Sequence, residues 1–337
     1  MRTRLLTFFA VLCLAPSIYG RKDLEIYFID VEGGQATLFV TPAGQSLLVD
    51  TGWPGNAFRD ANRIVKAAKL ADIKKIDYLL ITHFHVDHVG GVPQLAAKMP
   101  IGTFIDHGPN REDSNSGRVN YEDYLKAIGS SQHLVVKPGD HLPVKGIDAV
   151  VVSADGNVID QPLPGAGQPN AFCAQSPARE VDTTENARST GIVITYANLK
   201  IVDLGDLTWN KELALMCPNN KLGLADILVV SHHGSDLSNS PALVHALAPR
   251  VAIMDNGKKK GASPAAWDVV HSSPGLVQLW QLHFADEGGK EHNVPDPFIA
   301  NIDEADTGYY LLLTADPSGR FTVFNPRNKL TRVYQTR

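Results

Sequence analysis

The sequence predicts an α/β fold in which a β-sheet packs against helices, and three observations support this prediction. Residues 24–40 read as two apolar strands joined through a glycine pair, and residues 45–52 read as a third strand. Residues 57–71 carry apolar side chains at near-helical spacing, and residues 78–81 form a short apolar run of strand length. Three strands, a helix and a strand in this order suit a sheet covered by helices. No linker, charge block or internal repeat divides the chain, so residues 21–337 are predicted to form a single domain.

The first twenty residues have the layout of a secretory signal peptide. Arg2 and Arg4 supply a basic start, residues 5–15 are almost entirely apolar, and Pro16 ends the run. This apolar run is too short to span a membrane as a helix. We therefore expect residues 1–20 to be a signal peptide, the protein to be periplasmic or extracellular, and the mature chain to have no membrane span.

Charge and cysteine content narrow the possible partners and structure. The chain has 31 basic and 36 acidic residues, a mild acidity that disfavours a broad nucleic-acid-binding face but leaves a small local one open. Beyond residue 20 the only cysteines are Cys173 and Cys217. In an oxidising compartment we expect them to form a disulfide, the alternative being two unpaired thiols. The sequence gives no sign of a protein partner.

The strongest chemical signal follows the strand at residues 78–81. Its loop places His83, His85, Asp87 and His88 at H-x-H-x-D-H spacing, a mixture of imidazole and carboxylate that suits zinc, manganese or iron. His83 and His85 alternate, so an extended segment points both to one side, where they could hold one ion. Asp87 and His88 are better placed to hold a second ion, as in two-metal hydrolytic sites. We therefore predict two divalent cations, zinc foremost; the alternative is a polar surface loop.

Two later strands also end in residues of metal-ligand type. One apolar hairpin ends in Gly205-Asp206, and a later apolar strand ends in His232-His233. An aspartate can bridge two cations, and we favour Asp206 over Asp203 because Gly205 frees the backbone at the strand end. One of the two histidines is expected to complete the second metal site while the other faces the substrate.

The histidine motif, in its place after a strand, resembles that of the metallo-β-lactamase superfamily. The resemblance implies an αββα sandwich with the metal ions at one edge of its two sheets. Further segments are similar to the branch that contains the hydrolase domain of ComEC-type competence proteins: residues 28–36, 50–52, 185–189, 204–206 and 232–235. By this resemblance His233 is the metal ligand, His232 contacts the substrate phosphate or leaving group, and Asp50 supports the metal histidines from the second shell. The alternative for Asp50 is a turn-capping aspartate.

The chain departs from the superfamily at one ligand. Many members have a further histidine before the bridging aspartate, whereas the corresponding strand end at residues 152–155 reads Val-Ser-Ala-Asp. The first metal is left with His83, His85 and Asp206. The site would then bind one metal weakly, recruit His107, or fill the gap with water.

Three further residues are candidates for substrate contact. His107 follows an apolar strand and could reach the site, the alternative being a structural role. Lys258 and Lys259 lie, with Lys260, on a glycine-bounded turn whose three lysines could meet an anionic substrate, the alternative being a solvated surface loop.

Other segments contribute predicted elements but no chemistry. Residues 133–153 supply two short strands in a hairpin-like arrangement, and residues 309–324 read as a closing hairpin. Residues 157–184 form a long proline-rich loop that we expect to border the active site. Residues 262–306 read as helical and turn-rich pieces.

Together these features predict a secreted metal-dependent hydrolase. A metal-activated hydroxide would attack a phosphorus or carbonyl centre, Asp87 would orient it as well as bind metal, and His232 would stabilise the developing charge. We favour a phosphodiester, small or polymeric, and hence a phosphodiesterase or nuclease-like enzyme.

Three alternatives remain open from sequence. The same centre could hydrolyse lactones, lactams or other ester and amide bonds. A di-iron redox site is a second option, but that branch typically has glutamate where this chain has His85. The non-enzymatic option is a secreted binding protein with a vestigial metal site.

Overall fold

The computed structural model describes residues 23–303 and 305–337, so the predicted signal peptide at residues 1–20 lies outside the described residues. Within the described ranges, no helix combines the length and hydrophobicity needed to cross a bilayer.

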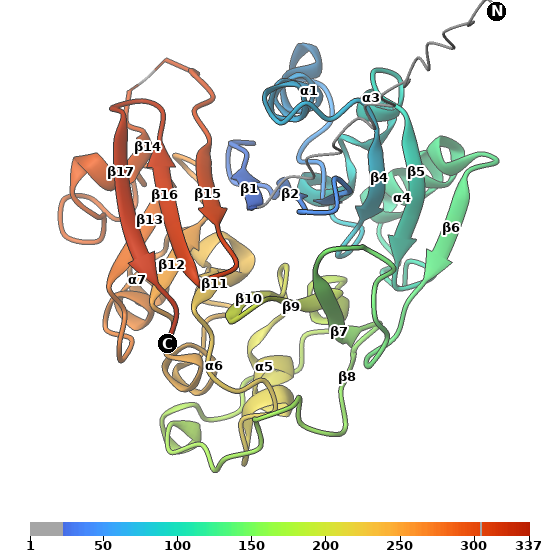
Figure 1. The fold of residues 1–337 in the computed structure, drawn as a ribbon. Helices are drawn as coiled ribbons and strands as arrows, with labels where there is room; N and C mark the ends of the chain where they lie inside the picture. The colour runs from blue at the N-terminus through green and yellow to red at the C-terminus, as the bar shows by residue number, and fades with distance from the viewer. Residues whose placement is uncertain (1–22, 304) are drawn as a thin grey trace, which may run out of the picture.

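Two large sheets form the centre of the fold (Figure 1). The first has nine strands in the order β17-β16-β15-β1-β2-β3-β4-β5-β6. In that order their bounds are Leu330–Gln335, Arg320–Asn325, Leu311–Ala315, Leu24–Phe28, Thr37–Val40, Ser46–Val49, Ile76–Leu80, Ile101–Asp106 and Gln132–Val135. The second has eight strands in the order β14-β13-β12-β11-β10-β9-β7-β8. Their bounds are Ile299–Asn301, Gln278–His283, Val251–Met254, Ile227–Val229, Leu199–Asp203, Gly191–Tyr196, Asp148–Ala154 and Asn157–Val158.

Helices cover the outer face of each sheet, which confirms the predicted αββα sandwich. Those outside the first sheet are α1 (Arg59–Leu70), α3 (Val92–Ala96) and α4 (Asn115–Ile128). Those outside the second are α5 (Trp209–Met216), α6 (Pro241–Leu247) and α7 (Pro264–His271). Each sheet therefore has two buried faces, one against its helices and one against the other sheet.

The alternation of side chains along the strands builds these layers. In β3, Leu47 and Val49 enter the core between the sheets, whereas Leu48 packs under the helices. In β10, Leu199 and Ile201 face the core between the sheets and Val202 faces the helices of the second layer. Because successive strand residues point to opposite faces, continuous apolar runs are what a doubly buried sheet requires.

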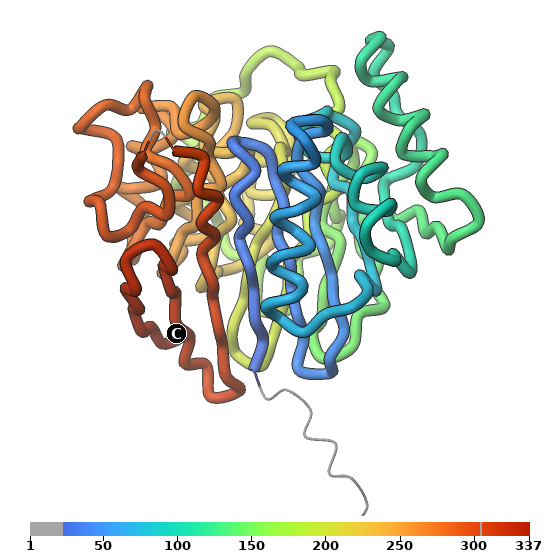
Figure 2. The backbone as a smooth tube through the Cα atoms, turned by 90° about the horizontal axis from the view of Figure 1, so that it is seen from above, coloured from blue at the N-terminus to red at the C-terminus, as the bar shows by residue number. Residues whose placement is uncertain are grey.

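The two ends of the described chain meet in the first sheet. Strand β15 pairs antiparallel with β1, from Leu24 opposite Ala315 to Phe28 opposite Leu311. Figure 2 shows the C-terminal strands in red beside the N-terminal strands in blue. The predicted closing hairpin is present as β15 and β16, and it extends the sheet formed by the N-terminal half.

The structure corrects the expectation of a hairpin within residues 133–153. The strands expected as a hairpin within residues 133–153 are β6 and β7, and they belong to different sheets: β6 pairs parallel with β5, and β7 pairs antiparallel with β9. The segment between them carries the chain from one sheet to the other.

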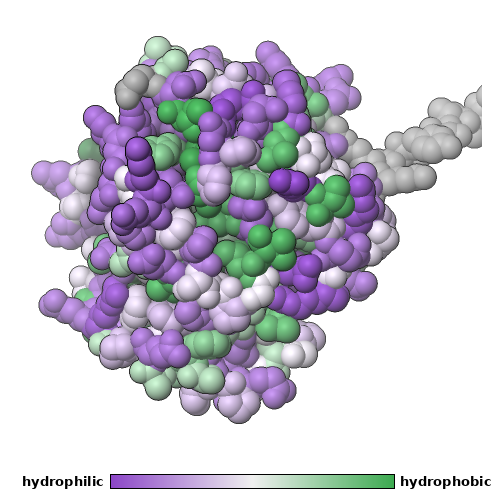
Figure 3. All heavy atoms as spheres, turned by 90° about the vertical axis from the view of Figure 1, so that its left-hand side faces the viewer, coloured by the Kyte–Doolittle hydropathy of each residue, from purple (hydrophilic) through white to green (hydrophobic). Residues whose placement is uncertain are grey.

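Strands β13, β14 and β17 were not predicted. Strand β13 is buried along most of its length although it mixes glutamine, tryptophan and histidine with leucine, so it lacks an apolar period. Strand β17 is an edge strand with mostly exposed residues, and on its side of the molecule hydrophobic and hydrophilic side chains are interspersed (Figure 3).

Cys173 and Cys217 form the expected disulfide. It joins the proline-rich loop to the residue that follows α5, across a sequence separation of 44.

The core between the sheets yields a stability prediction. Trp280 on β13 is fully buried there, and its indole N–H donates to the Tyr334 hydroxyl at 3.0 Å. We expect Trp280→Ala to lower the free energy of unfolding by about 3–5 kcal/mol, measured by denaturant titration, because it leaves a large cavity. Val277→Ala is the control, since Val277 is 54% exposed and should change the free energy by less than about 0.5 kcal/mol. Equal effects of the two substitutions would contradict this account of the core.

Candidate metal centre

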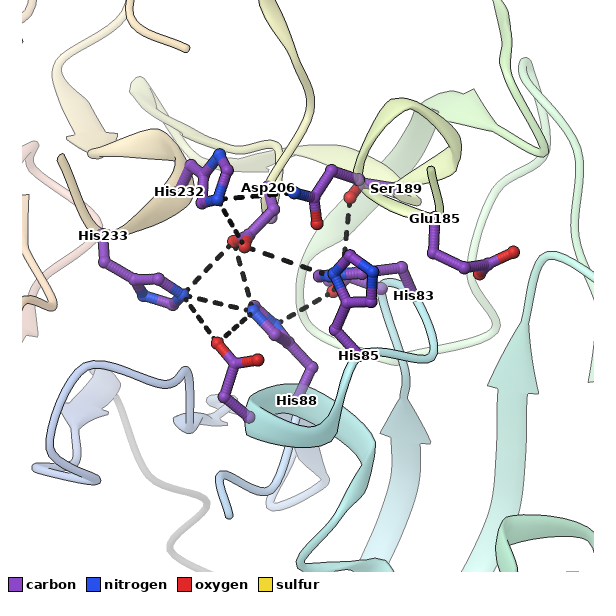
Figure 4. Close-up of polar contacts among 12 residues, drawn as sticks. His83, His85, His88, Glu185, Ser189, Asp206, His232 and His233 are labelled. Atoms are coloured by element: carbon purple, nitrogen blue, oxygen red, sulfur yellow. Dashed lines mark hydrogen bonds and ion pairs between the residues drawn. The ribbon is translucent and has the colours of Figure 1, made fainter. Parts of the chain in front are cut away.

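The loops with the predicted ligands meet at one edge of the sandwich. Strands β3, β4 and β5 run parallel in the first sheet, and β10, β11 and β12 run parallel in the second. The loops that follow β4, β10 and β11 therefore leave at the carboxyl ends of parallel strands, where α/β sheets place their ligands. Figure 4 shows the side chains from these loops converging.

Four of these residues form a compact cluster, which we call the ligand cluster: Asp87, His88, Asp206 and His233. One ligand atom from each lies within 4.8 Å of every other, and all four residues are buried. The short helix α2 (Val86–Val89) presents Asp87 and His88. His88 Nε2 lies 3.2 Å from His233 Nε2 and 3.2 Å from Asp206 Oδ1, and His233 Nε2 lies 3.3 Å from Asp87 Oδ2. Two imidazole nitrogens face each other between two carboxylates, as ligands of a shared cation would.

A carboxylate lies behind each of these histidines; the one behind His88 is hydrogen-bonded to it, whereas the one behind His233 lies within ion-pair distance only. Asp50 Oδ2 lies 2.7 Å from His88 Nδ1 and also accepts a hydrogen bond from the Thr82 hydroxyl at 2.7 Å. Asp255 Oδ1 lies 3.4 Å from His233 Nδ1. A carboxylate on Nδ1 holds the proton on that atom and leaves Nε2 free to bind metal. The structure thus places Asp50 against a cluster histidine, as the sequence resemblance implies. Asp203 instead accepts a hydrogen bond from the Gln35 side chain, away from the cluster.

His83 and His85 do not join this cluster. His83 Nε2 lies 3.9 Å from Asp206 Oδ2; it is buried and has no hydrogen-bond partner among the described residues. His85 instead places Nε2 2.9 Å from Glu112 Oε2, with 27% of its side chain exposed. The expectation that His83 and His85 converge on one ion is therefore not met in this structure, because Glu112, which sequence reasoning missed, competes for His85.

His107 also has a different partner from the one expected. Its Nε2 lies 3.0 Å from Glu185 Oε2, and the pair is buried. Glu185 also accepts hydrogen bonds from the backbone N–H groups of Phe84 and Arg111. A buried carboxylate requires such partners, so His107 has a structural role here and does not fill the place of the absent third histidine.

His232 faces the cluster from the neighbouring loop. Its Nε2 lies 3.4 Å from Asp206 Oδ2 and 3.4 Å from Asn186 Nδ2, while Ser238 Oγ lies 3.3 Å from its Nδ1. His232 and His233 both have φ 54°, so these adjacent residues adopt a left-handed turn that directs their rings differently. Such backbone strain is typical of functional sites. Gly261 supports the turn, since a Cβ on it would lie 2.1 Å from His233 O.

The third lysine of the glycine-bounded turn, Lys260, also reaches the cluster. The Lys260 ammonium forms an ion pair with Asp87 and lies 5.1 Å from the centre of the Trp53 ring. Lys258 and Lys259 line, together with Lys260, an adjacent cavity of about 590 Å³. The position of Lys260 next to Gly261 is the one signal that could have distinguished it, because that glycine brings the lysine loop against His233.

The electrostatics of the cluster fit a bound cation. Burial by itself would raise the pKa of Asp206, but His232, His88 and His233 hold it well below the usual value. Burial opposes charge on His233, yet Asp206 and neighbouring carboxylates raise its pKa to about 10. The pKa of His88 is likewise raised well above its usual value, against burial, by Asp206, Asp87 and Asp50. Two buried imidazoles that attract protons mark a place that requires positive charge, and metal ions compete with protons for such ligands.

His83 differs in its titration and in its partners. Burial, together with His88 and His85, lowers its pKa well below the usual value. Its neutral ring and unpartnered Nε2 suit a second cation that shares Asp206. The donor set therefore fits one ion at the ligand cluster and, in part, a second ion at His83.

Comparison with known proteins supports the fold. Residues 29–170 match the sequence profile described as the Metallo-beta-lactamase superfamily. "Recombination protein 2" of Haemophilus influenzae is 24% identical over 257 residues, which cover 74% of this chain and 27% of that protein. "ComE operon protein 3" of Bacillus subtilis is 23% identical over 274 residues, which cover 77% of this chain and 31% of that protein. A hydroxyacylglutathione hydrolase of Stenotrophomonas maltophilia is 35% identical over 65 residues, 19% of this chain and 26% of that protein.

The chain spans about a quarter to a third of the length of these relatives. A solved metal-dependent hydrolase of the β-lactamase superfamily is 15% identical, the match covers 77% of this chain and 95% of that one, and the two superpose with a TM-score of 0.42. The family match, the αββα sandwich and the ligand cluster agree. Residues 29–170 therefore match the metallo-β-lactamase superfamily within this sandwich, and the chain is similar at low identity to proteins named for recombination and competence.

Proposed function

We propose that this protein hydrolyses phosphodiester bonds with divalent cations held at the ligand cluster and at His83. The observation that carries the proposal is that a lysine and a histidine outside the ligand cluster lie beside its two carboxylates. Lys260 contacts Asp87, and His232 lies 3.4 Å from Asp206. A cation and a hydrogen-bonding imidazole beside a metal site suit a substrate that is anionic and becomes more so during reaction.

In this proposal Asp87, His88, Asp206 and His233 would hold one cation, and His83 and Asp206, joined by His85 once it leaves Glu112, would hold the second. Zinc is the best match to this nitrogen and oxygen donor set, with manganese and iron as alternatives. Bound cations would supply Lewis acidity and an activated water.

The remaining roles belong to side chains of the chain itself. Asp50 keeps the proton of His88 on Nδ1, and Asp87 accepts a hydrogen bond from the attacking water and orients it. His232, anchored through Nδ1 by Ser238, directs Nε2 toward the substrate and stabilises charge on the leaving group. Lys260, which pairs with Asp87, is the side chain that would bind the substrate phosphate.

The relatives support a phosphodiester more than a thioester. Those that cover about three quarters of the chain are named for recombination and competence, whereas the hydroxyacylglutathione hydrolase of Stenotrophomonas maltophilia covers 19% of it. We further propose that residues 1–20 direct export and that the enzyme works in the cell envelope or outside the cell.

Turnover of bis(p-nitrophenyl) phosphate tests the reaction. We expect hydrolysis with added zinc or manganese, loss with a chelator, and a fall in kcat/KM of at least about 100-fold in Asp87→Asn, because losses of even outer-shell partners cost 10- to 100-fold. His141→Gln is the control, since His141 lies at the surface with 63% of its side chain exposed.

Other outcomes of this assay would redirect the proposal. Bound metal without phosphodiester turnover, together with cleavage of a lactone, a lactam or a thioester, would assign the centre to those substrates. Neither turnover nor bound metal would identify a binding protein with a vestigial site.

The Asp50–His88 contact predicts a change in metal affinity. Asp50→Asn should weaken zinc binding by about 10- to 100-fold in calorimetric titration, because an amide holds the imidazole less firmly. Asp203→Asn is the matched control: burial raises the pKa of Asp203 to about 7, so a neutral side chain is tolerated there, and this residue does not touch the cluster. Equal loss of affinity in both variants would rule out a specific role for Asp50.

The different surroundings of His85 and His233 predict unequal metal sites. His85 must leave Glu112 before it can bind, so we expect the second cation to bind more weakly than the first. Elemental analysis after dialysis should find His85→Ala with one retained ion and His233→Ala with the tighter ion lost. Loss of both ions in His85→Ala would show that His85 belongs to the tight site.

A further inference from the structure

A pocket of about 410 Å³ lies on the His232 side of the ligand cluster, apart from the cavity that holds the lysines. Three segments surround it: the loop before the Glu185–Ser189 segment, the start of α5, and the turn that follows His233. Its lining residues include Arg179, Val181, Thr184, Asn186, Thr208, Trp209 and Leu237. We call it the Trp209 pocket.

Hydrogen bonds join these segments, so the walls of the pocket are held in place relative to one another. The Asn210 side chain accepts from the Arg179 N–H at 2.9 Å and donates to the Arg179 carbonyl at 2.7 Å. The Trp209 indole donates to Pro177 O at 2.9 Å, and the Trp209 backbone N–H donates to Leu237 O at 3.0 Å. Arg179 also donates to the Asp236 carbonyl.

Three residues of the lining have buried polar atoms without a partner. Thr184 Oγ1, Asn186 Oδ1 and Thr208 Oγ1 are buried, and none makes a hydrogen bond within the described part of the chain. Thr208 is 4% exposed and stands at the N-cap of α5, yet its hydroxyl does not cap the helix. A buried polar group without a partner is unfavourable, so three around one pocket indicate that a ligand supplies the partners.

The other lining side chains are flat or apolar. The Arg179 guanidinium stacks 3.4 Å above the centre of the Trp209 ring. Val181 and Leu237 are 73% and 56% exposed. A sugar ring carries hydroxyls around its whole rim and would leave many of them unpaired against such walls. A planar ring with apolar faces and a polar edge matches both the walls and the three polar atoms.

Asn186 connects the pocket to the metal centre. It lines the pocket and lies 3.4 Å from His232 Nε2, which itself lies 3.4 Å from Asp206 Oδ2. A ring in the pocket would therefore sit one side chain away from a phosphate at the cluster.

We propose that the Trp209 pocket binds a planar heteroaromatic ring with a hydrogen-bonding edge, as a nucleobase has, on one side of the scissile phosphodiester. This inference rests on the proposed phosphodiesterase function. The ring stacks against Arg179 and Trp209, and its edge pairs with Thr184, Asn186 and Thr208.

Calorimetry on the chelator-treated protein tests the pocket without catalysis. Thymidine 5′-monophosphate should bind at least about tenfold more tightly than ribose 5-phosphate, which has the phosphate and sugar but no base, because one base stack alone is worth about 5- to 100-fold or more. Equal affinities would overturn the proposal. Tighter binding of glucose 6-phosphate than of thymidine 5′-monophosphate would also overturn it, since the pocket would then be one for sugars.

Two substitutions assign the effect to the pocket. Arg179→Lys keeps the charge but loses the stacking plane, and Thr208→Val keeps the shape but loses the hydroxyl. Each substitution should weaken the binding of thymidine 5′-monophosphate about 5- to 100-fold and leave the affinity for ribose 5-phosphate unchanged. Arg332→Lys is the matched control, because Arg332 lies over the Phe298 ring far along the chain from the pocket. If Thr208→Val fails to fold, the exposed Arg179 decides the question, and unchanged affinity in Arg179→Lys refutes the stacking.

Kinetics separate this proposal from the one on which it rests. Thymidine 5′-(p-nitrophenyl phosphate) and methyl p-nitrophenyl phosphate share a leaving group, and only the first carries a ring on the other side of the phosphate. Arg179→Lys should raise KM for the first substrate about 5- to 100-fold and leave that for the second unchanged. Turnover of both substrates with equal response to Arg179→Lys would refute the pocket alone, whereas turnover of neither would refute the phosphodiesterase function.

Discussion

The buried carboxylates of Asp87 and Asp206 are the constraint on which the rest of this site depends. Both lie at the edge of the sandwich, almost out of contact with water, and a buried carboxylate is unfavourable unless positive charge accompanies it. In the structure His88, His233 and Lys260 provide that charge. The same buried ligand atoms could hold a metal ion, which would supply the positive charge in place of these groups. The cluster is thus stable as a protein site only because something cationic occupies it.

The two sheets share the construction of this centre. The first sheet supplies Asp87 and His88 through the loop after β4, and the second supplies Asp206 and His233 after β10 and β11. A cation at the cluster therefore joins the two halves of the sandwich at one edge. The distance between its ligands is determined by the apolar core between the sheets, since a close-packed interior fixes the separation of the strands that carry them. The packing of the core therefore also sets the geometry of the site.

The surroundings of the cluster are unequal on its two flanks. On the Asp87 side lies a charged cavity with lysines and aspartates, and on the His232 side lies the Trp209 pocket with apolar walls and unpartnered polar atoms. An anionic group with an uncharged ring attached would find a matching environment on each side. The difference between the two flanks would also favour one orientation of a bound substrate, which a symmetric pair of metal ions would not do by itself.

Local patterns in the sequence predicted a sheet covered by helices and the main ligands, and the resemblance carried by the histidine motif implied the αββα architecture. The partners of these ligands depended on the tertiary structure. Apolar runs predicted β1 to β4, and the H-x-H-x-D-H spacing with Gly-Asp and His-His at later strand ends identified all four cluster residues, because these features are encoded within a few neighbouring positions. The pairing of His85 with Glu112, of His107 with Glu185 and of Lys260 with Asp87 joins residues 27, 78 and 173 positions apart, and no local period records such pairs. Strands β13 and β17 escaped prediction for a related reason, since burial by neighbouring strands, and not their own composition, makes them strands.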